Sequence, residues 1–182
     1  MKILPLVMFI LISVNLFGQI ESRQDWSKSI QREFDLINKQ NIDTVLVYYT
    51  HFGPWTNLPD SCHEISSVSI LWIKNDNYYS KQLFCDSIVT NNIVPISSKP
   101  FRFFLSHIKD FKMRDKYYKQ TKNPLFSSTD VSEEYLILMT KQDNLCVNIS
   151  ADQRTNEKWN KIGWIKQMTE AIDITKLELN IK

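Results

Sequence analysis

The sequence predicts an α+β fold, with a mainly antiparallel sheet of about five to six strands and three helices packed on one face of it. Three observations lead to this prediction. Apolar residues recur at helical spacing in three segments. Other runs are rich in β-branched and aromatic residues, which favour strands. Short polar turns join four of these runs into two β-hairpins, so that neighbouring strands are antiparallel. No linker or repeat interrupts the pattern, and residues 19–182 are expected to form one globular domain.

One helix and one strand begin the predicted domain. Residues 24–40 are expected to be helical, because an apolar stripe repeats every three or four positions along them. The stripe consists of Trp26, Ile30, Phe34 and Ile37. The run 44–49 that follows is dominated by β-branched and aromatic residues and predicts a buried strand. The next stretch, 51–66, contains Gly and Pro at turn positions and is expected to be an irregular loop.

Two hairpins supply most of the remaining strands. The first joins 68–74 to 78–85 across a short polar turn. The second joins 134–140 to 144–150, and apolar and polar residues alternate along its second strand, which predicts one buried face. A short extended piece at 93–96 is expected between the two hairpins.

Two more helices and a last strand complete the prediction. Ser98 is expected to cap a helix whose apolar stripe starts at Phe101. Asn156 is expected to cap a third helix over 157–172. The end of the chain, 175–181, alternates strictly between polar and apolar residues, which predicts a final strand; a continued helix is the alternative.

The first eighteen residues predict export from the cytoplasm. Lys2 precedes an almost unbroken apolar run that ends near Gly18, a small residue suited to a signal-peptidase site. The apolar core is about 15 residues long, shorter than the roughly 20 that a membrane span requires. Residues 1–18 are therefore interpreted as a cleaved signal peptide. The mature chain is expected to be periplasmic or secreted, with no transmembrane span after cleavage.

Charge and glycine content argue against several classes of function. The formal net charge is +2, which gives no electrostatic argument for nucleic acid as a partner. The chain has 3 glycines, so the glycine-rich loops that hold nucleotide phosphates are absent. The G-x-S-x-G motif of α/β-hydrolases is absent as well. No cofactor and no resident metal are predicted.

The three cysteines allow one disulfide bond. An exported protein meets an oxidising compartment, where pairing is favoured. We expect a Cys62–Cys85 bond, because Cys62 lies in the predicted loop and Cys85 at the end of a predicted strand. Cys146 lies inside a predicted strand and is expected to be a small buried side chain. Three unpaired thiols are the alternative.

The predicted loop after the first strand carries the densest set of reactive side chains. The candidate binding residues are His51, Trp55, Asp60, His63 and Glu64. Imidazoles and carboxylates together can bind a metal ion, and Cys62 with a histidine can form a nucleophile–base pair. No fixed ligand spacing supports either chemistry, so an ordinary loop held by a disulfide is the leading interpretation. Trp55 follows Gly-Pro and is expected to be exposed, and contact with a glycan or peptide is the functional alternative for it.

Basic and aromatic residues interleave between positions 109 and 122. Such a segment can contact an anionic glycan or lipid headgroup weakly. The candidate contacts are Lys112, Arg114, Lys116 and Lys119. The leading interpretation of the segment is a solvated helix face whose lysine stems cover apolar neighbours, and the anionic contact is the alternative.

These observations favour a non-catalytic exported protein that binds another protein or a component of the cell envelope, as an inhibitor or immunity protein does. The composition, rich in Lys, Asn and Ile, is typical of AT-rich bacterial genomes. The alternative is a small periplasmic hydrolase or metal-dependent enzyme that uses His51, His63 and a nearby carboxylate.

Overall fold

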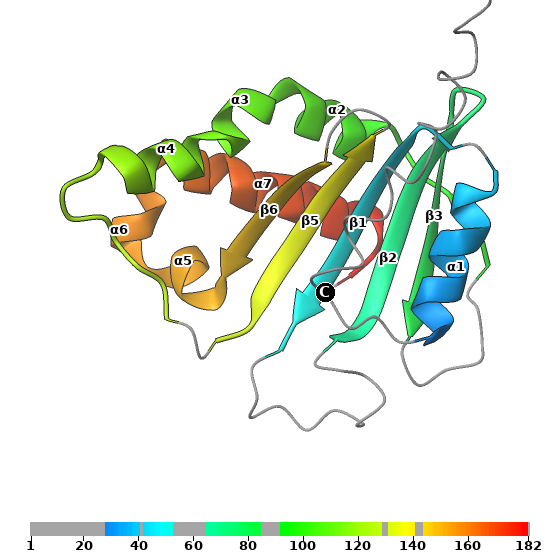
Figure 1. Ribbon diagram of the computed structural model, residues 1–182, viewed down its shortest axis with the longest axis horizontal. Coiled ribbons are helices and arrows are strands. Elements are labelled where there is room, and N and C mark those ends of the chain that lie inside the picture. Colours follow the sequence, from blue (N-terminus) through cyan, green and yellow to red (C-terminus); the bar gives the residue numbers. More distant parts are fainter. Residues whose placement is uncertain are drawn as a thin grey trace, which may run out of the picture.

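The computed structural model describes residues 28–40, 42–52, 65–84, 92–128, 131–140 and 144–181 (Figure 1). These segments form a six-stranded antiparallel sheet with helices packed against it, which confirms the predicted α+β class. The strands are β1 Thr44–His51, β2 Ile65–Lys74, β3 Asn77–Phe84, β4 Val94–Pro95, β5 Glu133–Thr140 and β6 Asn144–Ser150. The helices are α1 Lys28–Asn38, α2 Lys99–Ser106, α3 Ile108–Phe111, α4 Met113–Gln120, α5 Ala151–Thr155, α6 Glu157–Asn160 and α7 Gly163–Glu178.

Both predicted hairpins are present, and a strand pairing that local sequence does not encode joins them. The order of strands across the sheet is β4-β3-β2-β1-β5-β6. The β2–β3 hairpin turns at Asn75 and Asp76, whose φ angles are 51° and 59°. Two consecutive left-handed residues make the tight turn that matches the twist of a hairpin. The β1 strand pairs with both β2 and β5, and so connects the two hairpins.

Helices cover both faces of the sheet, so the expectation that all of them pack on one face is wrong for α1. Because strand side chains alternate between faces, β1 contributes Leu46 and Tyr48 to one core cluster and Val47 and Tyr49 to the other. We name the first face the α7 face and the second the α1 face. Phe34 and Ile37 of α1 pack on the second face, where α1 lies over β3 (Figure 1).

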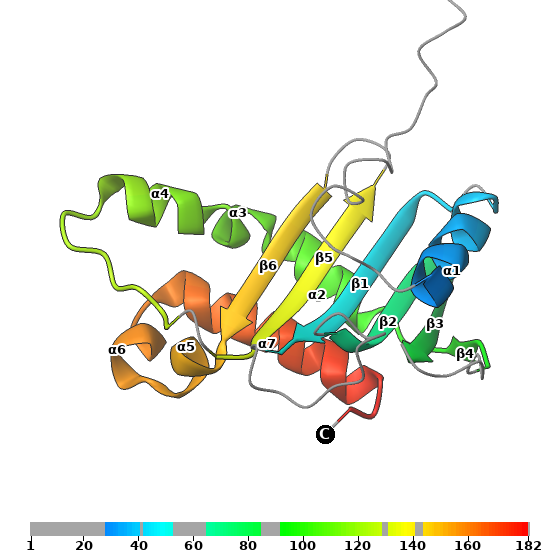
Figure 2. The same cartoon turned by 60° about the horizontal axis from the view of Figure 1, so that its bottom comes forward.

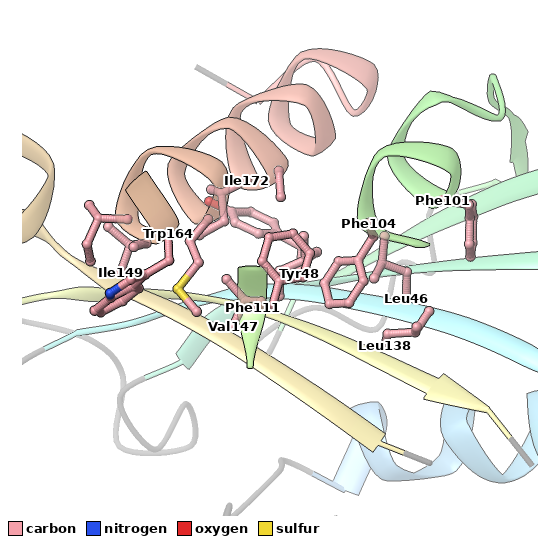
Figure 3. Packing of buried hydrophobic residues seen from close by; sticks show 14 of the residues in the cluster. Leu46, Tyr48, Phe101, Phe104, Phe111, Leu138, Val147, Ile149, Trp164 and Ile172 are labelled. Atoms are coloured by element: carbon pink, nitrogen blue, oxygen red, sulfur yellow. The ribbon is translucent and has the colours of Figure 1, made fainter. Parts of the chain in front are cut away.

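The larger core lies on the α7 face. Side chains from the strands meet those of α2, α3 and α7 there (Figure 3). Phe104 and Ile172 are fully buried from the helix side, and Leu46 is fully buried from the strand side. Aromatic rings account for much of this cluster, and they bury the most apolar area per residue.

The predicted final strand does not form, and the alternative of a continued helix is what the structure shows. Helix α7 extends to Glu178. Its buried residues Met168, Ile172 and Thr175 recur at helical spacing, whereas Leu177 is 78% exposed. Leu177 lies on the outer side of the last turn, whereas Leu179 and Ile181, which follow the helix, pack against the α7-face core.

The helices predicted before and after the second hairpin are divided, and the second of them, predicted over 157–172, becomes α6 and an α7 that runs on to Glu178. The expected continuous helix from residue 98 is divided into α2, α3 and α4, with breaks at His107 and Lys112. Ser98 makes no side-chain cap; instead, the amide and hydroxyl of Ser97 donate to Glu178 at 2.5 and 2.7 Å, which fastens the start of α2 to the end of α7. Asn156 does cap α6, as predicted, by accepting from the Lys158 amide.

Candidate functional site

The predicted binding loop falls largely outside the described residues. The predicted site residues that lie outside the described ranges are Trp55, Asp60, Cys62, His63, Glu64 and Cys85. The Cys62–Cys85 bond therefore stays a prediction. His51 is described, and it is the last residue of β1 rather than the first of a loop. Its side chain is half-buried. The site is therefore built here from His51 and from what the sheet places beside it.

The pairing of three strands gathers polar side chains around His51 on the α1 face. His51 lies opposite Glu133 of β5, and one step along the face Tyr49 lies opposite Tyr135. Tyr135 in turn lies opposite Asn148 of β6. Because side chains two positions apart share a face, these residues form adjacent rows of one surface. The edge strand β6 contributes the more polar of its two faces to this surface.

A chain of hydrogen bonds converges on Glu133. Arg114 of α4 donates to the Oδ1 atom of Asn148, and the amide nitrogen of Asn148 donates to Glu133 Oε2 at 3.5 Å. The hydroxyl of Tyr135 donates to the same carboxylate oxygen. Asn148 is only 8% exposed, so its amide is oriented by these two partners and not by solvent. We call His51, Arg114, Glu133, Tyr135 and Asn148 the α1-face cluster.

Aromatic contacts hold the rings of the cluster in place. Tyr135 stacks on Tyr49 with ring centroids 4.8 Å apart and an interplanar angle of 2°. His51 meets the edge of Tyr135 at 6.5 Å and 77°. Burial, reinforced by the hydrogen bond to Glu133, raises the pKa of Tyr135 well above its usual value. Tyr135 is therefore protonated throughout the physiological range and acts as a fixed donor.

The chemistry of this cluster suits recognition. Its donors are already aimed at one carboxylate, and no described residue donates to the other oxygen, Glu133 Oε1. A partner can therefore meet an oriented acceptor beside two aromatic rings. Within the described ranges, no group of three or more His, Cys, Asp or Glu side chains is placed to hold a metal ion. The Cys146 side chain, expected to be buried, is exposed on β6, and its thiol is unbonded.

A second polar cluster occupies the opposite face of β5. The carboxylate of Glu134 accepts from Tyr48 Oη and Lys176 Nζ, each at 2.9 Å, and from Arg154 Nε at 2.8 Å. Arg154 also pairs with Asp173 at 2.7 Å. Burial alone would raise the pKa of Glu134, but the Lys176, Arg154 and Tyr48 contacts outweigh it and hold that pKa below its usual value. This saturated cluster joins α5 and α7 to the sheet.

The four predicted anionic contacts divide between two environments. Lys112, Lys116 and Lys119 are exposed. Arg114 is half-buried and belongs to the α1-face cluster through Asn148. The segment is thus not a uniform basic face, because one of its cations has a structural role at the edge of the sheet.

Sequence reasoning did not single out Glu133, Tyr135 or Asn148. Alternation along β6 did place Asn148 on the more polar face of that strand. What it could not supply was the β1–β5 register, which brings these residues to His51.

Comparisons with known proteins add no assignment to this geometry. Neither a family model, nor a curated protein, nor a solved structure matches the chain. Among the helices of the described segments, none combines the length and apolar character that crossing a membrane would demand.

Proposed function

We propose that the protein is an exported, non-catalytic binding module whose α1-face cluster recognises a protein partner, in the manner of an inhibitor or immunity protein. The observation that carries the proposal is the hydrogen-bond chain from Arg114 through Asn148 to Glu133. It fixes the orientation of a half-buried carboxylate before any partner arrives. Preorganised polar groups lose less conformational entropy on binding.

The residue types of the cluster support a protein partner. Tyrosine and arginine are enriched among the residues that dominate binding energy at protein interfaces. Here Tyr135 is held by stacking on Tyr49, and Arg114 is held by Asn148. The cluster therefore combines rigid aromatic area with one open acceptor, Glu133 Oε1, which suits a Lys or Arg side chain of the partner.

The test compares capture by the wild-type chain with capture by matched variants. The chain is immobilised and exposed to envelope and secreted fractions of its source, and bound proteins are quantified by mass spectrometry. Glu133→Gln and His51→Ala are expected to lose a protein that the wild type retains. Glu170→Gln, a change at an exposed carboxylate on α7, is expected to retain it. The identified protein is then titrated directly against each variant.

Two outcomes would contradict this proposal. A partner that binds all variants equally would place recognition elsewhere on the chain. The second contradicting outcome is the one that the hydrolase alternative predicts. In that case the double variant His51→Ala and His63→Ala abolishes turnover of an ester, amide or glycoside substrate, while partner binding is unaffected.

A further inference from the structure

The segment that contains α4 concentrates positive charge. Between positions 109 and 122 it carries six basic and two acidic residues, although the whole chain has a net charge of only +2. Lys116, Lys119 and Lys122 are all exposed. Figure 2 shows α4 at the end of the molecule opposite α1, where it extends away from the sheet. The charge therefore lies on a projecting part of the surface.

An exposed aromatic ring lies against the same helix. Phe126 is 75% exposed, and its ring stacks on Tyr118 of α4 with centroids 5.8 Å apart. Its neighbour Leu125 packs against the α7-face core, and the Leu125 amide donates to Tyr117 Oη at 2.9 Å. The backbone before Phe126 is thus fastened to the body, so the phenyl ring is held outward although burial would be favourable.

The inner side of α4 is fixed, which makes its outer side a defined surface. Tyr117 packs against Trp159 and Trp164, at centroid distances of 6.4 and 5.7 Å. Arg114 reaches Asn148 at the edge of the sheet. Lys116 and Lys119 are exposed, whereas Tyr118 is half-buried, packs against the α7-face core and stacks on the exposed Phe126 ring.

We propose that this surface, formed by Lys116, Lys119, Lys122, Tyr118 and Phe126, docks the protein on an anionic lipid bilayer. The lysines attract the anionic headgroups, each within about one Debye length of the membrane. Phe126 enters the interface between headgroups and acyl chains, where aromatic side chains gain from burial. A soluble polyanion would use the lysines but would give Phe126 no apolar environment, which is why a bilayer fits the surface better. This docking is independent of the α1-face cluster.

Vesicle sedimentation tests the proposal. The chain is purified as recovered after export, with its N-terminus determined by mass spectrometry, so that residues 1–18 do not contribute. It is mixed with vesicles of neutral phosphatidylcholine, or with the same vesicles containing about 30% phosphatidylglycerol, since surface charge sets the attraction. Binding is expected only to the anionic vesicles. It should fall steeply as salt rises from about 0.05 to 0.5 M, where the Debye length shortens severalfold.

Matched variants separate the lysines from the aromatic ring. Replacing Lys116, Lys119 and Lys122 together by Gln should weaken binding on the order of 100-fold, from the usual attraction of each lysine to an anionic surface. The control replaces Lys39, Lys99 and Lys161, three exposed lysines elsewhere, and should lose far less. Phe126→Ala should weaken vesicle binding at least about 10-fold, which corresponds to the free energy gained by burying a phenyl ring. The same variant should leave binding to heparin unchanged.

Three results would overturn the proposal. Equal binding to neutral and anionic vesicles would remove the electrostatic basis. Equal losses in the two lysine triples would show a nonspecific charge effect and no docking surface. Full vesicle binding by Phe126→Ala, with heparin binding lost in the α4 triple, would assign the surface to a soluble polyanion and not to a bilayer. Because all the replaced side chains are exposed, each variant is expected to fold. Far-ultraviolet circular dichroism of each variant checks that the fold is intact.

Discussion

Glu133 and Glu134 are neighbours on one strand, yet they face opposite sides of the sheet and do different things. Glu134 points to the α7 face, where Tyr48, Arg154 and Lys176 saturate it at 2.6 to 2.9 Å. Glu133 points to the α1 face, where its donors occupy one oxygen and the other has no donor among the described residues. Removing one partner from the saturated cluster leaves the others unpaired and is costly, whereas the proposed function assigns the unfilled oxygen of Glu133 to a binding partner. Position on the pleat, rather than residue type, decides which partners surround each of these carboxylates.

Replacing each glutamate by glutamine tests this difference most strongly. Glu134→Gln should lower the free energy of unfolding by about 2–3 kcal/mol, because it leaves two cations and a buried hydroxyl short of their charged acceptor. Glu133→Gln should cost less than about 1 kcal/mol, since its surroundings are half-exposed. Urea unfolding followed by circular dichroism measures both.

The exposed Glu170 provides the control for this pair, and Glu170→Gln should change stability by less than about 0.5 kcal/mol. Equal costs at positions 133 and 134 would show that the two faces hold their carboxylates equally firmly. The contrast between a structural cluster and a binding cluster would then fail.

Acid titration separates the two carboxylates by a smaller effect. The folded-state pKa of Glu134 is lowered, so its contribution to stability is fully present above the unfolded-state value of about 4.3 and is lost as pH falls through the folded pKa. Urea midpoints measured from about pH 6 to pH 3 should therefore decline in the wild type. The decline should be shallower in Glu134→Gln and unaltered in Glu170→Gln. An identical acid-side slope in the wild type and Glu134→Gln would contradict the lowered pKa.

Asn148→Ala probes the buried part of the α1-face cluster. It removes the amide that links Arg114 to Glu133, and the expected loss is about 1–2 kcal/mol, the cost of leaving a part-buried donor unpaired. Asn160→Ala, at an exposed position on α6, should stay within about 0.5 kcal/mol of the wild type. Because Arg114 also positions α4, hydrogen exchange of the α4 amides should rise in Asn148→Ala and not in the control. Unchanged exchange would mean that Arg114 does not fasten α4 through Asn148.

The sequence predicts the parts of this fold that depend on neighbouring residues. The two hairpins follow from alternating strands and polar turns, and Trp72 is buried as its strand pattern indicates. The Ser150-to-Gln153 capping box that starts α5 was legible as a Ser-x-x-Gln pattern, but no helix was predicted between the strand 144–150 and the helix 157–172. The same local reasoning turned the end of α7 into a strand, because Leu177, exposed on the last turn, and Leu179 and Ile181, packed against the core after it, alternate with polar residues.

The candidate site depends on contacts that are distant along the chain, and these were not predictable. His51 was identified by its residue type, but its partner Glu133 is 82 positions away and is set only by the β1–β5 register. Likewise, the sequence of residues 109–122 gives no sign that one of its basic residues differs from the others. The structure shows that Arg114 donates a hydrogen bond to Asn148. Periodicity specifies which face of the sheet a side chain occupies, and long-range strand pairing specifies which residues of the adjacent strands lie beside it on that face.

The Tyr135 hydroxyl provides the finest test of the comparison between the two faces. Tyr135→Phe keeps the ring that stacks on Tyr49 and removes only the donor to Glu133, so the expected loss of stability is about 0.5–1 kcal/mol. The control is Tyr79→Phe, a half-buried tyrosine on the same face that stacks on Trp72 at 5.9 Å, with an expected change near zero. A double-mutant cycle with Glu133→Gln then isolates the pair, because contacting residues are not additive. If Tyr135→Phe costs as much with glutamine at position 133 as with glutamate, the hydroxyl does not act through the carboxylate. The α1-face cluster would then lose the donor that orients Glu133, and the distinction between the two neighbouring glutamates would rest on burial alone.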